Sequence, residues 1–387
     1  MASLLEYLNT TREALKSSPG ASLHVVLGNE ACDLDSAVSA LVYAFLIYSL
    51  QQVPKEGEGV VVVPVLNIPR QDYPLKTEVI YWLKKHHIHS QALFFREDVD
   101  LSEQQRAGKL QLTLVDHHVL PAADAHLDTS VVFVLDHRKL ERRPDSVPGG
   151  VVVEMVGSCC TLVAEQILSR NPTLLDAVTA GLLYGTIILD TVNLNEAAKR
   201  VTPKDVDIVH RLRPLLQSSV NRNEIFQELT TAKGNVSGLT TEQLLRKDLK
   251  VVSAGDLKVG VASVPMMVKK FLEQTELAKT LSDHCISQGY SVLVIMGIDI
   301  SGETVRRDIA IFSPRDGFRN QLVQHLCEAQ DRVLQLLPFE SGVDGCSAFL
   351  QRNTAASRKV VLPFIKEWLA KKKLDGLDDH QEPLTGH

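Results

Sequence analysis

The chain has 387 residues, which is too long for one ordinary hydrophobic core, so two domains are the natural expectation. Its hydrophobic content of 44% and charged content of 23% are typical of a soluble globular protein. The net charge of −6 argues against general nucleic-acid binding, and no apolar run reaches the length of a membrane span.

Residues 1–11 lack the basic segment and the apolar core of a signal peptide. The six cysteines show no CxxC pair and no spacing typical of a disulfide framework, and Cys159 and Cys160 are adjacent. This usage is typical of reduced thiols. We therefore expect a cytoplasmic protein, and a nuclear pool is compatible with the sequence.

The first half alternates apolar runs with helical patterns. The predicted strands are 23–27, 60–66, 92–95, 112–115, 131–135 and 151–156. The predicted helices are 4–16, 37–50, 75–85, 101–107, 159–169, 172–189 and 203–216. Continuous apolar strands between helices indicate a mostly parallel sheet covered on both faces. No G-x-G-x-x-G follows the first strand, so the dinucleotide-binding fingerprint is missing.

A polar segment, 217–238, contains a predicted helix at 224–231 and is interpreted as a linker between domains 1–216 and 239–370. The second domain is expected to be a smaller α/β or α+β unit. Its predicted elements are helix 240–246, strands 249–253 and 259–264, a long helix 266–281, strands 291–300 and 306–312, and helices 320–336 and 355–370. Residues 371–387 are interpreted as a polar tail.

Four apolar runs end in carboxylate or imidazole side chains. The run 112–115 is followed by Asp116, His117 and His118. The other three runs are followed by Asp33 and Asp35, by Asp136 and His137, and by Asp190. Ligands bind beyond the carboxyl ends of the strands in α/β sheets, so the four runs together predict a shared rim of oxygen and nitrogen ligands.

The residue types at this rim are those of a two-metal site for phosphoryl chemistry. Two metals need a bridging carboxylate with flanking ligands on both sides, and this set supplies them: Asp33, Asp35, Asp116, His137 and Asp190. Oxygen and imidazole ligands suit Mg²⁺ or Mn²⁺, and imidazole favours Mn²⁺. For Asp33 and Asp35 alone, an N-cap pair on the following helix is an equal alternative.

Six motifs resemble those of the DHH phosphoesterases, in the branch with a DHHA2 second domain. They are GNEACDLDS at 28–36, LVDHH at 114–118, VLDHR at 134–138, IILDTVN at 187–193, DLK at 248–250 and SRK at 357–359. That branch contains manganese-dependent inorganic pyrophosphatases, eukaryotic exopolyphosphatases and Prune proteins, and the first and third motifs are closest to Prune. The resemblance covers about 23–370. It implies a mostly parallel DHH domain, a smaller α/β DHHA2 domain and an active site in the cleft between them.

The resemblance also implies a role for each matching position. Asp116 would bridge two metal ions, either Mn²⁺ or Mg²⁺. Asp33 would hold the first ion, and Asp35, His137 and Asp190 would hold the second. From the second domain, the residues expected to bind phosphate are Lys250, Arg358 and Lys359. Arginine can donate two hydrogen bonds to phosphate oxygens, and lysine supplies a point charge. Without the first domain, 357–359 would be interpreted as a solvated helix N-terminus.

Two positions depart from the pyrophosphatase pattern. Asn29 stands where a histidine would hold the first metal, and an amide oxygen is a weaker and harder ligand. Arg138 replaces the second histidine of the DHH motif and is expected to face substrate at the cleft mouth. His117 and His118 are further catalytic candidates, and His118 is also compatible with an outer-shell role. The departures argue against efficient pyrophosphate hydrolysis.

The expected function is therefore a metal-dependent exopolyphosphatase that releases orthophosphate from short-chain polyphosphate. One alternative is a cyclic-nucleotide phosphodiesterase, although the low aromatic content of 5% favours polyphosphate. The other is a regulatory interaction protein on a weakened phosphatase scaffold, for which the resemblance implies nucleoside diphosphate kinase as partner. No nucleic-acid or membrane partner is expected, and the oligomeric state stays open.

Overall fold

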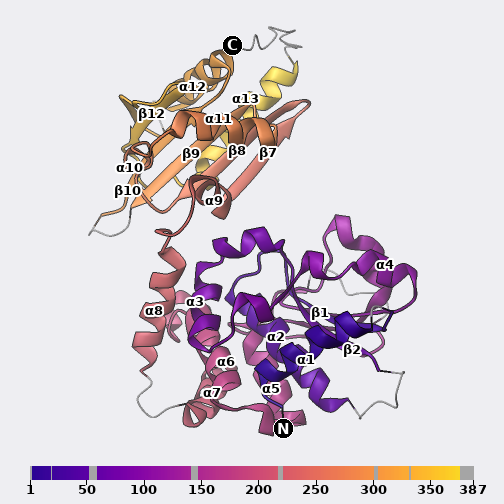
Figure 1. Ribbon diagram of the computed structural model, residues 1–387. Coiled ribbons are helices and arrows are strands. Elements are labelled where there is room, and N and C mark those ends of the chain that lie inside the picture. The colour runs from indigo at the N-terminus through magenta and orange to yellow at the C-terminus, as the bar shows by residue number, and fades with distance from the viewer. Residues whose placement is uncertain are drawn as a thin grey trace. The chain divides into compact units, whose positions relative to one another are not determined.

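The computed structural model describes residues 2–18, 20–51, 59–140, 147–216, 221–299, 304–330 and 333–374. The chain divides into two compact units, Met1–Asn235 and Val236–His387 (Figure 1). The division at 235/236 falls within the segment 217–238 interpreted as a linker. The predicted tail lies outside the described residues from position 375 onward.

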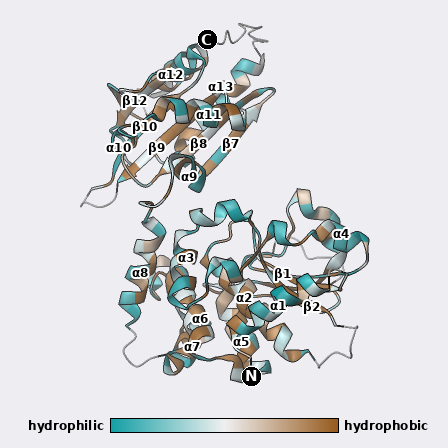
Figure 2. Ribbon diagram, in the orientation of Figure 1, coloured by the Kyte–Doolittle hydropathy of each residue, from teal (hydrophilic) through white to brown (hydrophobic). Residues whose placement is uncertain are grey.

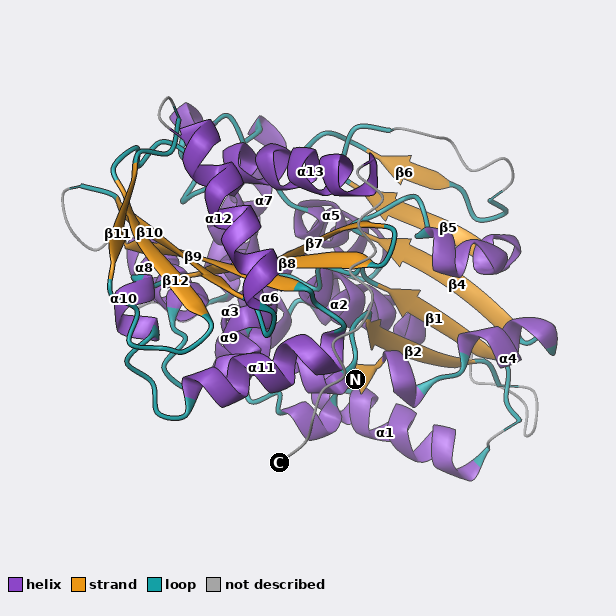
Figure 3. Cartoon of the chain, turned by 90° about the horizontal axis from the view of Figure 1, so that it is seen from above, coloured by secondary structure: helices purple, strands orange, loops and turns teal. Residues whose placement is uncertain are grey.

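The first unit is built on a six-stranded sheet with the order β3-β2-β1-β4-β5-β6. Its strands are β1 Leu23–Leu27, β2 Val61–Leu66, β3 Phe94–Phe95, β4 Leu110–Val115, β5 Val131–Asp136 and β6 Val151–Val153. Every neighbouring pair is parallel, and the arrowheads of β4, β5 and β6 point the same way in Figure 3. The parallel sheet predicted from the apolar runs is confirmed. It brings the carboxyl ends of β1, β4 and β5 side by side.

The helices of the first unit share one continuous apolar core with the strands. They are α1 Leu4–Ser17, α2 Leu34–Leu50, α3 Thr77–Lys85, α4 Leu101–Arg106, α5 Cys159–Arg170, α6 Ala177–Asp190, α7 Pro203–Leu212 and α8 Arg222–Gly234. Some of them pack on the sheet and others, such as α7 and α8, pack against the neighbouring helices. α2 contacts β1 and β2 as well as α5 and α6, which explains why it is apolar on every side (Figure 2).

One predicted helix of the first unit, 172–189, begins later than expected. Pro172–Leu174 forms a separate 3₁₀ turn, and α6 starts after Asp176. The Asp176 side chain accepts hydrogen bonds from Val178 N and Thr179 N, which caps the new helix. The change leaves Asp190 as the last residue of α6.

The second unit has a mixed six-stranded sheet with the order β11-β12-β10-β9-β8-β7. Its strands are β7 Leu249–Ala254, β8 Leu257–Val264, β9 Val292–Asp299, β10 Arg306–Phe312, β11 Leu336–Phe339 and β12 Cys346–Gln351. β8 and β9 are parallel, and the other pairs are antiparallel. The helices are α9 Thr241–Lys247, α10 Val268–Phe271, α11 Leu277–Gln288, α12 Asp316–Gln330 and α13 Arg358–Leu374.

The two faces of this sheet carry separate cores, because successive strand residues point to opposite sides. Val294 and Ile309 pack with α12 and α13, whereas Ile295 and Ala310 pack with α9, α10 and α11. In the part of the chain that the structure describes, no helix combines the length and apolar character needed to cross a membrane.

Two predictions for the second unit were wrong. The long helix 266–281 is broken into α10 and α11, because Glu276 adopts a left-handed conformation with φ of +55°. The predicted helix 320–336 stops at Gln330, and Leu336 instead opens β11. β11 and β12 were not predicted.

Candidate metal centre

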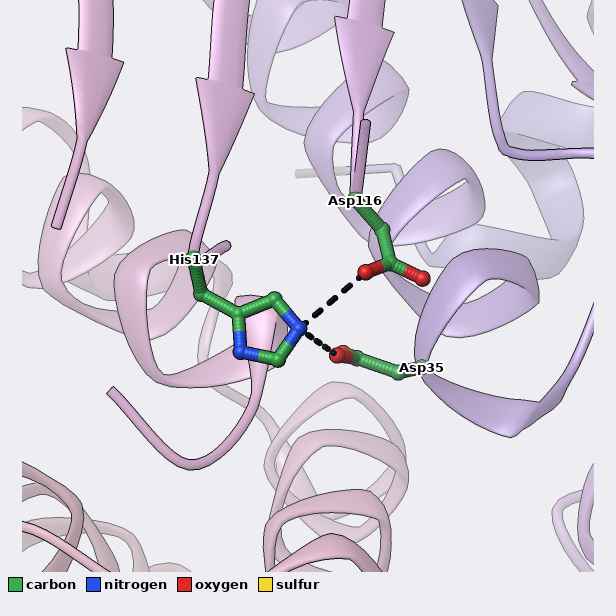
Figure 4. A group of neighbouring side chains, drawn as sticks. All are labelled: Asp35, Asp116 and His137. Atoms are coloured by element: carbon green, nitrogen blue, oxygen red, sulfur yellow. Dashed lines mark hydrogen bonds and ion pairs between the residues drawn. The ribbon is translucent and has the colours of Figure 1, made fainter. Parts of the chain in front are cut away.

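The parallel sheet brings three candidate ligands together at its carboxyl edge. Asp116 directly follows β4, His137 directly follows β5, and Asp35 lies in the first turn of α2. One ligand atom from each lies within 4.8 Å of the other two (Figure 4). His137 Nε2 is 3.2 Å from Asp116 Oδ1 and 3.5 Å from Asp35 Oδ2. Both carboxylates are buried, so their charges are poorly screened.

Asp35 is held by the N-terminus of α5. Cys159 N donates to Asp35 Oδ2 over 2.7 Å, and Cys160 N donates to Asp35 Oδ1 over 2.9 Å. Ser158 Oγ donates to the same Oδ1 over 2.9 Å. Backbone N–H groups at a helix N-terminus stabilise negative charge, so this contact keeps a carboxylate in a buried position.

Asp116 occupies a strained backbone position with a φ of +60°. Asn29 Nδ2 donates to Asp116 Oδ2 over 2.7 Å, and Arg138 Nη2 lies 3.6 Å from Asp116 Oδ1. Burial, followed by the charge of Asp35, raises the pKa of Asp116 to about 7. The site therefore disfavours a second negative charge next to Asp35 in the absence of a cation.

His137 is oriented by its other ring nitrogen. Nδ1 lies 2.9 Å from the Val156 carbonyl oxygen, to which it donates, so Nε2 faces the carboxylates. Burial alone would lower the pKa of His137, but the hydrogen bond to Asp116 and the charge of Asp35 raise it to about 10. Protonated His137 is therefore the counter-charge of the metal-free cluster, and a metal ion would displace its proton.

Asp33 and Asp190 lie beside this cluster. Asp33 caps α2, because its Oδ1 accepts from Ser36 N over 3.1 Å. Burial and the charge of Asp35 raise the pKa of both Asp33 and Asp190. Asp190 Oδ2 is buried and has no hydrogen-bond partner among the described residues. A buried carboxylate oxygen without a partner, in a cluster with too much negative charge, fits the ligand set of a divalent cation.

Asn29 differs from its expected role. Its Oδ1 accepts from Ala31 N over 2.9 Å and from Cys32 N over 3.1 Å, while its amide nitrogen donates to Asp116. With the amide turned over, its NH₂ group would face the N–H groups of Ala31 and Cys32, and its oxygen would face the Asp116 carboxylate. Asn29 is thus a hydrogen-bond donor to Asp116 in this structure and does not offer an oxygen ligand.

Asp136 organises the two histidines and the loop after β5. Its Oδ2 lies 2.5 Å from His118 Nδ1, and its Oδ1 accepts from His137 N over 2.7 Å and from Arg138 N over 3.2 Å. His118 therefore supports Asp136. Asp136 was counted in the predicted rim of polar side chains but received no role of its own, although its place at the start of the 136–138 motif was a usable signal.

His117 lies in a different environment. Its Nδ1 donates to the Val115 carbonyl over 2.9 Å, and its buried Nε2 has no hydrogen-bond partner in the described ranges. Burial lowers the pKa of His117, so the ring is neutral at neutral pH. Its Nε2 is consequently an available proton acceptor.

Left-handed backbone positions cluster near the candidate ligands. Besides Asp116, they include Cys32, next to Asp33, and the three consecutive residues 192–194, which follow Asp190 closely. Non-glycine residues with this conformation cost about 1–3 kcal/mol each and are concentrated at functional sites.

The comparisons with known proteins agree with this geometry. A family model described as the DHHA2 domain matches residues 227–368. Exopolyphosphatase PRUNE1 of Homo sapiens is 43% identical over 367 residues, which cover 94% of this chain and 79% of that protein. The Mus musculus protein of the same name is 44% identical with the same coverage. The chain belongs to the Prune family.

More distant similarities of this Prune family chain are to inorganic pyrophosphatases by name. A solved structure assigned to family II inorganic pyrophosphatase, from Methanococcus jannaschii, superposes with a TM-score of 0.50 at 22% identity, covering 90% of this chain and 99% of that one. A Brevibacillus brevis protein named "Probable manganese-dependent inorganic pyrophosphatase" is 28% identical over 242 residues, covering 62% of this chain and 69% of that protein.

The second unit of this Prune family chain brings its two basic motifs together. Arg358 Nη2 lies 2.5 Å from Asp248 Oδ1, and Arg358 Nη1 donates to the Asp248 carbonyl over 2.6 Å. The Arg358 side chain is largely buried, whereas Lys250 and Lys359 are exposed. Arg358 is therefore committed to joining α13 to the start of β7, and the two lysines carry the accessible charges.

The metal-free first unit is expected to lose stability as the pH rises from about 7 to about 9.5. The pKa of Asp116 is raised to about 7 and that of His137 to about 10. A raised pKa contributes stability below the ordinary pKa, and the contribution is lost as the pH rises through the raised value. Burial lowers the pKa of His24 and His86 to about 4, but this opposite effect ends near the ordinary value of 6.5.

Thermal unfolding followed by Trp82 fluorescence measures this slope. Trp82 and Trp368 are the two tryptophans of the chain, so Trp368→Phe leaves a single reporter in the first unit. A saturating divalent cation is expected to flatten the slope, because it would displace the His137 proton and keep the carboxylates ionised. A metal-free melting temperature that rises over the same pH range would contradict the assigned pKa shifts.

Proposed function

We propose that this chain is a divalent-metal-dependent exopolyphosphatase that releases orthophosphate from the end of short inorganic polyphosphate chains. The observation that carries the proposal is the convergence of Asp35, Asp116 and His137 at the carboxyl edge of the parallel sheet. The identity of 43% to the human exopolyphosphatase PRUNE1 along nearly the whole chain supports the choice of reaction and substrate class.

The proposed ligand set has more oxygen donors than one cation needs. Two ions per chain, Mn²⁺ or Mg²⁺, would be held by Asp33, Asp35, Asp116, His137 and Asp190, with Asp116 shared between them. Bound metal would supply an activated water molecule and stabilise charge on the phosphoryl oxygens. The manganese dependence in the name of the bacterial relative supports Mn²⁺.

The other residues near the cluster would handle substrate and proton. The Arg138 guanidinium is half exposed beside Asp116, so it can hold phosphate oxygens next to the reacting centre. His117 is neutral and has an unpartnered Nε2 within the described part of the chain, which suits it to accept a proton from the attacking water. His118 would act through Asp136 by fixing the loop that carries His137.

Phosphate release measured across a set of substrates tests the proposal. Pyrophosphate, tripolyphosphate, longer polyphosphate and a cyclic nucleotide would each be assayed with Mn²⁺, with Mg²⁺ and with a chelator. We expect metal-dependent release that is fastest on tripolyphosphate. Turnover of the cyclic nucleotide alone would favour a phosphodiesterase. Metal binding without turnover of any substrate would favour the regulatory alternative, with nucleoside diphosphate kinase as the partner to test.

We further propose that the second unit contributes phosphate-binding charges. Lys359→Ala and Lys250→Ala are each expected to raise KM for polyphosphate, because a charge-assisted hydrogen bond to phosphate is worth about 1.5–3 kcal/mol, or about 10- to 150-fold. Arg358→Ala should also lower the melting temperature, since it leaves Asp248 without its partner.

Mn²⁺ affinity is the second measurement for these variants, and it should stay at the wild-type value in all three. Lys279→Ala is a matched control, because this exposed lysine on α11 pairs only with Asp283 one helical turn away among the contacts described. If Lys279→Ala raised KM as much as Lys359→Ala, the effect would come from a general loss of positive charge and not from a phosphate contact of Lys359.

A further inference from the structure

The candidate metal ligands Asp35 and His137 both rest on residues 156–160, named the 156–160 loop, which consist of the loop before α5 and the first two residues of α5. The Val156 carbonyl accepts from His137 Nδ1 and so fixes the direction of Nε2. The same loop supplies all the α5 donors to Asp35, which are Ser158 Oγ, Cys159 N and Cys160 N. A shift of the 156–160 loop would therefore move two ligands of the metal centre at once.

Asp205, in the first turn of α7, anchors this loop from outside the cluster. It is fully buried, and Gly157 N donates to its Oδ1 over 3.1 Å and to its Oδ2 over 2.9 Å. Thr161 Oγ1 donates to Oδ1 over 2.6 Å. Thr202 donates twice to Oδ2, from its backbone N and from Oγ1, each over 2.7 Å.

These contacts exceed what capping of α7 requires. A capping box uses only the reciprocal bonds between Thr202 and Asp205. The bonds from Gly157 and Thr161 add nothing to the cap of α7, and they connect the carboxylate to the start of α5. A buried carboxylate with this number of donors fixes the positions of all of them, because each broken bond would leave a buried polar group unpaired.

The position of Gly157 leaves no room for a side chain. A Cβ atom there would lie 2.5 Å from the Arg200 carbonyl oxygen, 2.6 Å from Thr191 Cγ2 and 2.9 Å from Asp205 Oδ2. Thr191 directly follows Asp190, the candidate ligand with an unpartnered oxygen in the described residues. Gly157 is thus wedged between Asp205 and the segment that carries a third ligand.

We propose that Asp205 is a positioning residue of the metal centre. It touches none of the candidate ligands, and it acts through Gly157 by holding the 156–160 loop against Asp35 and His137. The inference rests on the proposed metal-dependent function. Outer-shell residues that orient metal ligands typically contribute 10- to 100-fold to metal affinity, and that range is the expected contribution here.

Mn²⁺ affinity of the metal-free protein, measured by titration calorimetry and by the EPR signal of free Mn²⁺, tests this role in three variants. Asp205→Asn keeps the side-chain volume but replaces one of the two acceptor oxygens with an NH₂ donor, and it should weaken Mn²⁺ binding about 10- to 100-fold. Thr202→Val is the matched control. It removes the hydroxyl half of the α7 cap and leaves the bonds from Gly157 to Asp205, so its Mn²⁺ affinity should stay within about twofold of wild type although its melting temperature falls.

Gly157→Ala keeps the test decisive if Asp205→Asn does not fold. The added Cβ would lie too close to the Arg200 carbonyl, Thr191 and Asp205, so the packing of Gly157 must change and this variant should lose Mn²⁺ affinity by a similar factor. Wild-type affinity in Asp205→Asn, or an equal loss in Thr202→Val, would overturn the positioning role. A wild-type chain that binds neither Mn²⁺ nor Mg²⁺ would instead overturn the proposed function.

Discussion

Asp116→Asn is expected to lower metal-dependent phosphate release by at least about a hundredfold, the upper end of what outer-shell substitutions cause. Asp116 is the carboxylate that contacts His137, Asn29 and Arg138 together, so it lies at the centre of the cluster. Asparagine keeps the shape and tolerates the left-handed backbone, but it cannot supply the negative charge that two cations would share.

The same variant should not lose stability in the absence of metal. Asp116 is buried next to Asp35, and like charges in a buried site repel. The metal-free melting temperature of Asp116→Asn at pH 8 is therefore expected to stay level or rise. Asp116→Ala should follow the same trend with a slightly lower melting temperature, because alanine tolerates the φ of +60° less well than asparagine. Asp124→Asn, which removes a carboxylate paired with Arg96, is the control for loss of an aspartate elsewhere. Full activity of Asp116→Asn would remove the two-metal interpretation.

The carboxyl edge of the first sheet could be predicted because its signal is local. The runs 112–115 and 131–135 are apolar and are followed at once by Asp116 and by Asp136 and His137, and parallel pairing puts such ends on one edge whatever the details of packing. The structure accordingly brings Asp35, Asp116 and His137 within reach of one metal ion.

The supports of that edge could not be predicted, because each joins segments distant in sequence. Nothing local to Asp35 indicates that α5 will donate to it, 123 to 125 positions further along the chain. The Asn29 amide is a similar case, since its orientation depends on Asp116, 87 positions away. Asp205 looks like an ordinary helix cap in the sequence, and only the packing of α7 against the start of α5 reveals its bonds to Gly157.

In the second unit the sequence failed where the backbone departs from its helical pattern. The helical spacing of apolar residues is continuous over 266–281. The helix is broken by the left-handed backbone of Glu276, which the spacing of apolar residues does not reveal. Leu336 was assigned to a helix because apolar spacing in short runs fits both helix and strand, and the pairing of β11 with β12 decides between them.

Arg138→His is expected to lower kcat/KM on tripolyphosphate about 10- to 150-fold while leaving pyrophosphate turnover unchanged or improved. The Arg138 side chain is 54% exposed, and its Nη2 lies 3.6 Å from Asp116 Oδ1. The guanidinium thus lies beside the candidate metal cluster. Its permanent charge and planar fork can still hold a second or third phosphate bidentately, which pyrophosphate offers only in part.

Kinetics of wild type, Arg138→His and Arg138→Lys on both substrates decide the role of this residue. Lysine keeps the charge without the fork, so Arg138→Lys should retain more tripolyphosphate activity than Arg138→His and less than wild type. Histidine would also return a titratable group to the site and add pH dependence near neutrality. An equal loss on both substrates would show that Arg138 serves the ion pair with Asp116. Asp136 would be a second structural partner, because its Oδ1 accepts from the Arg138 backbone N–H over 3.2 Å and its charge acts on the guanidinium.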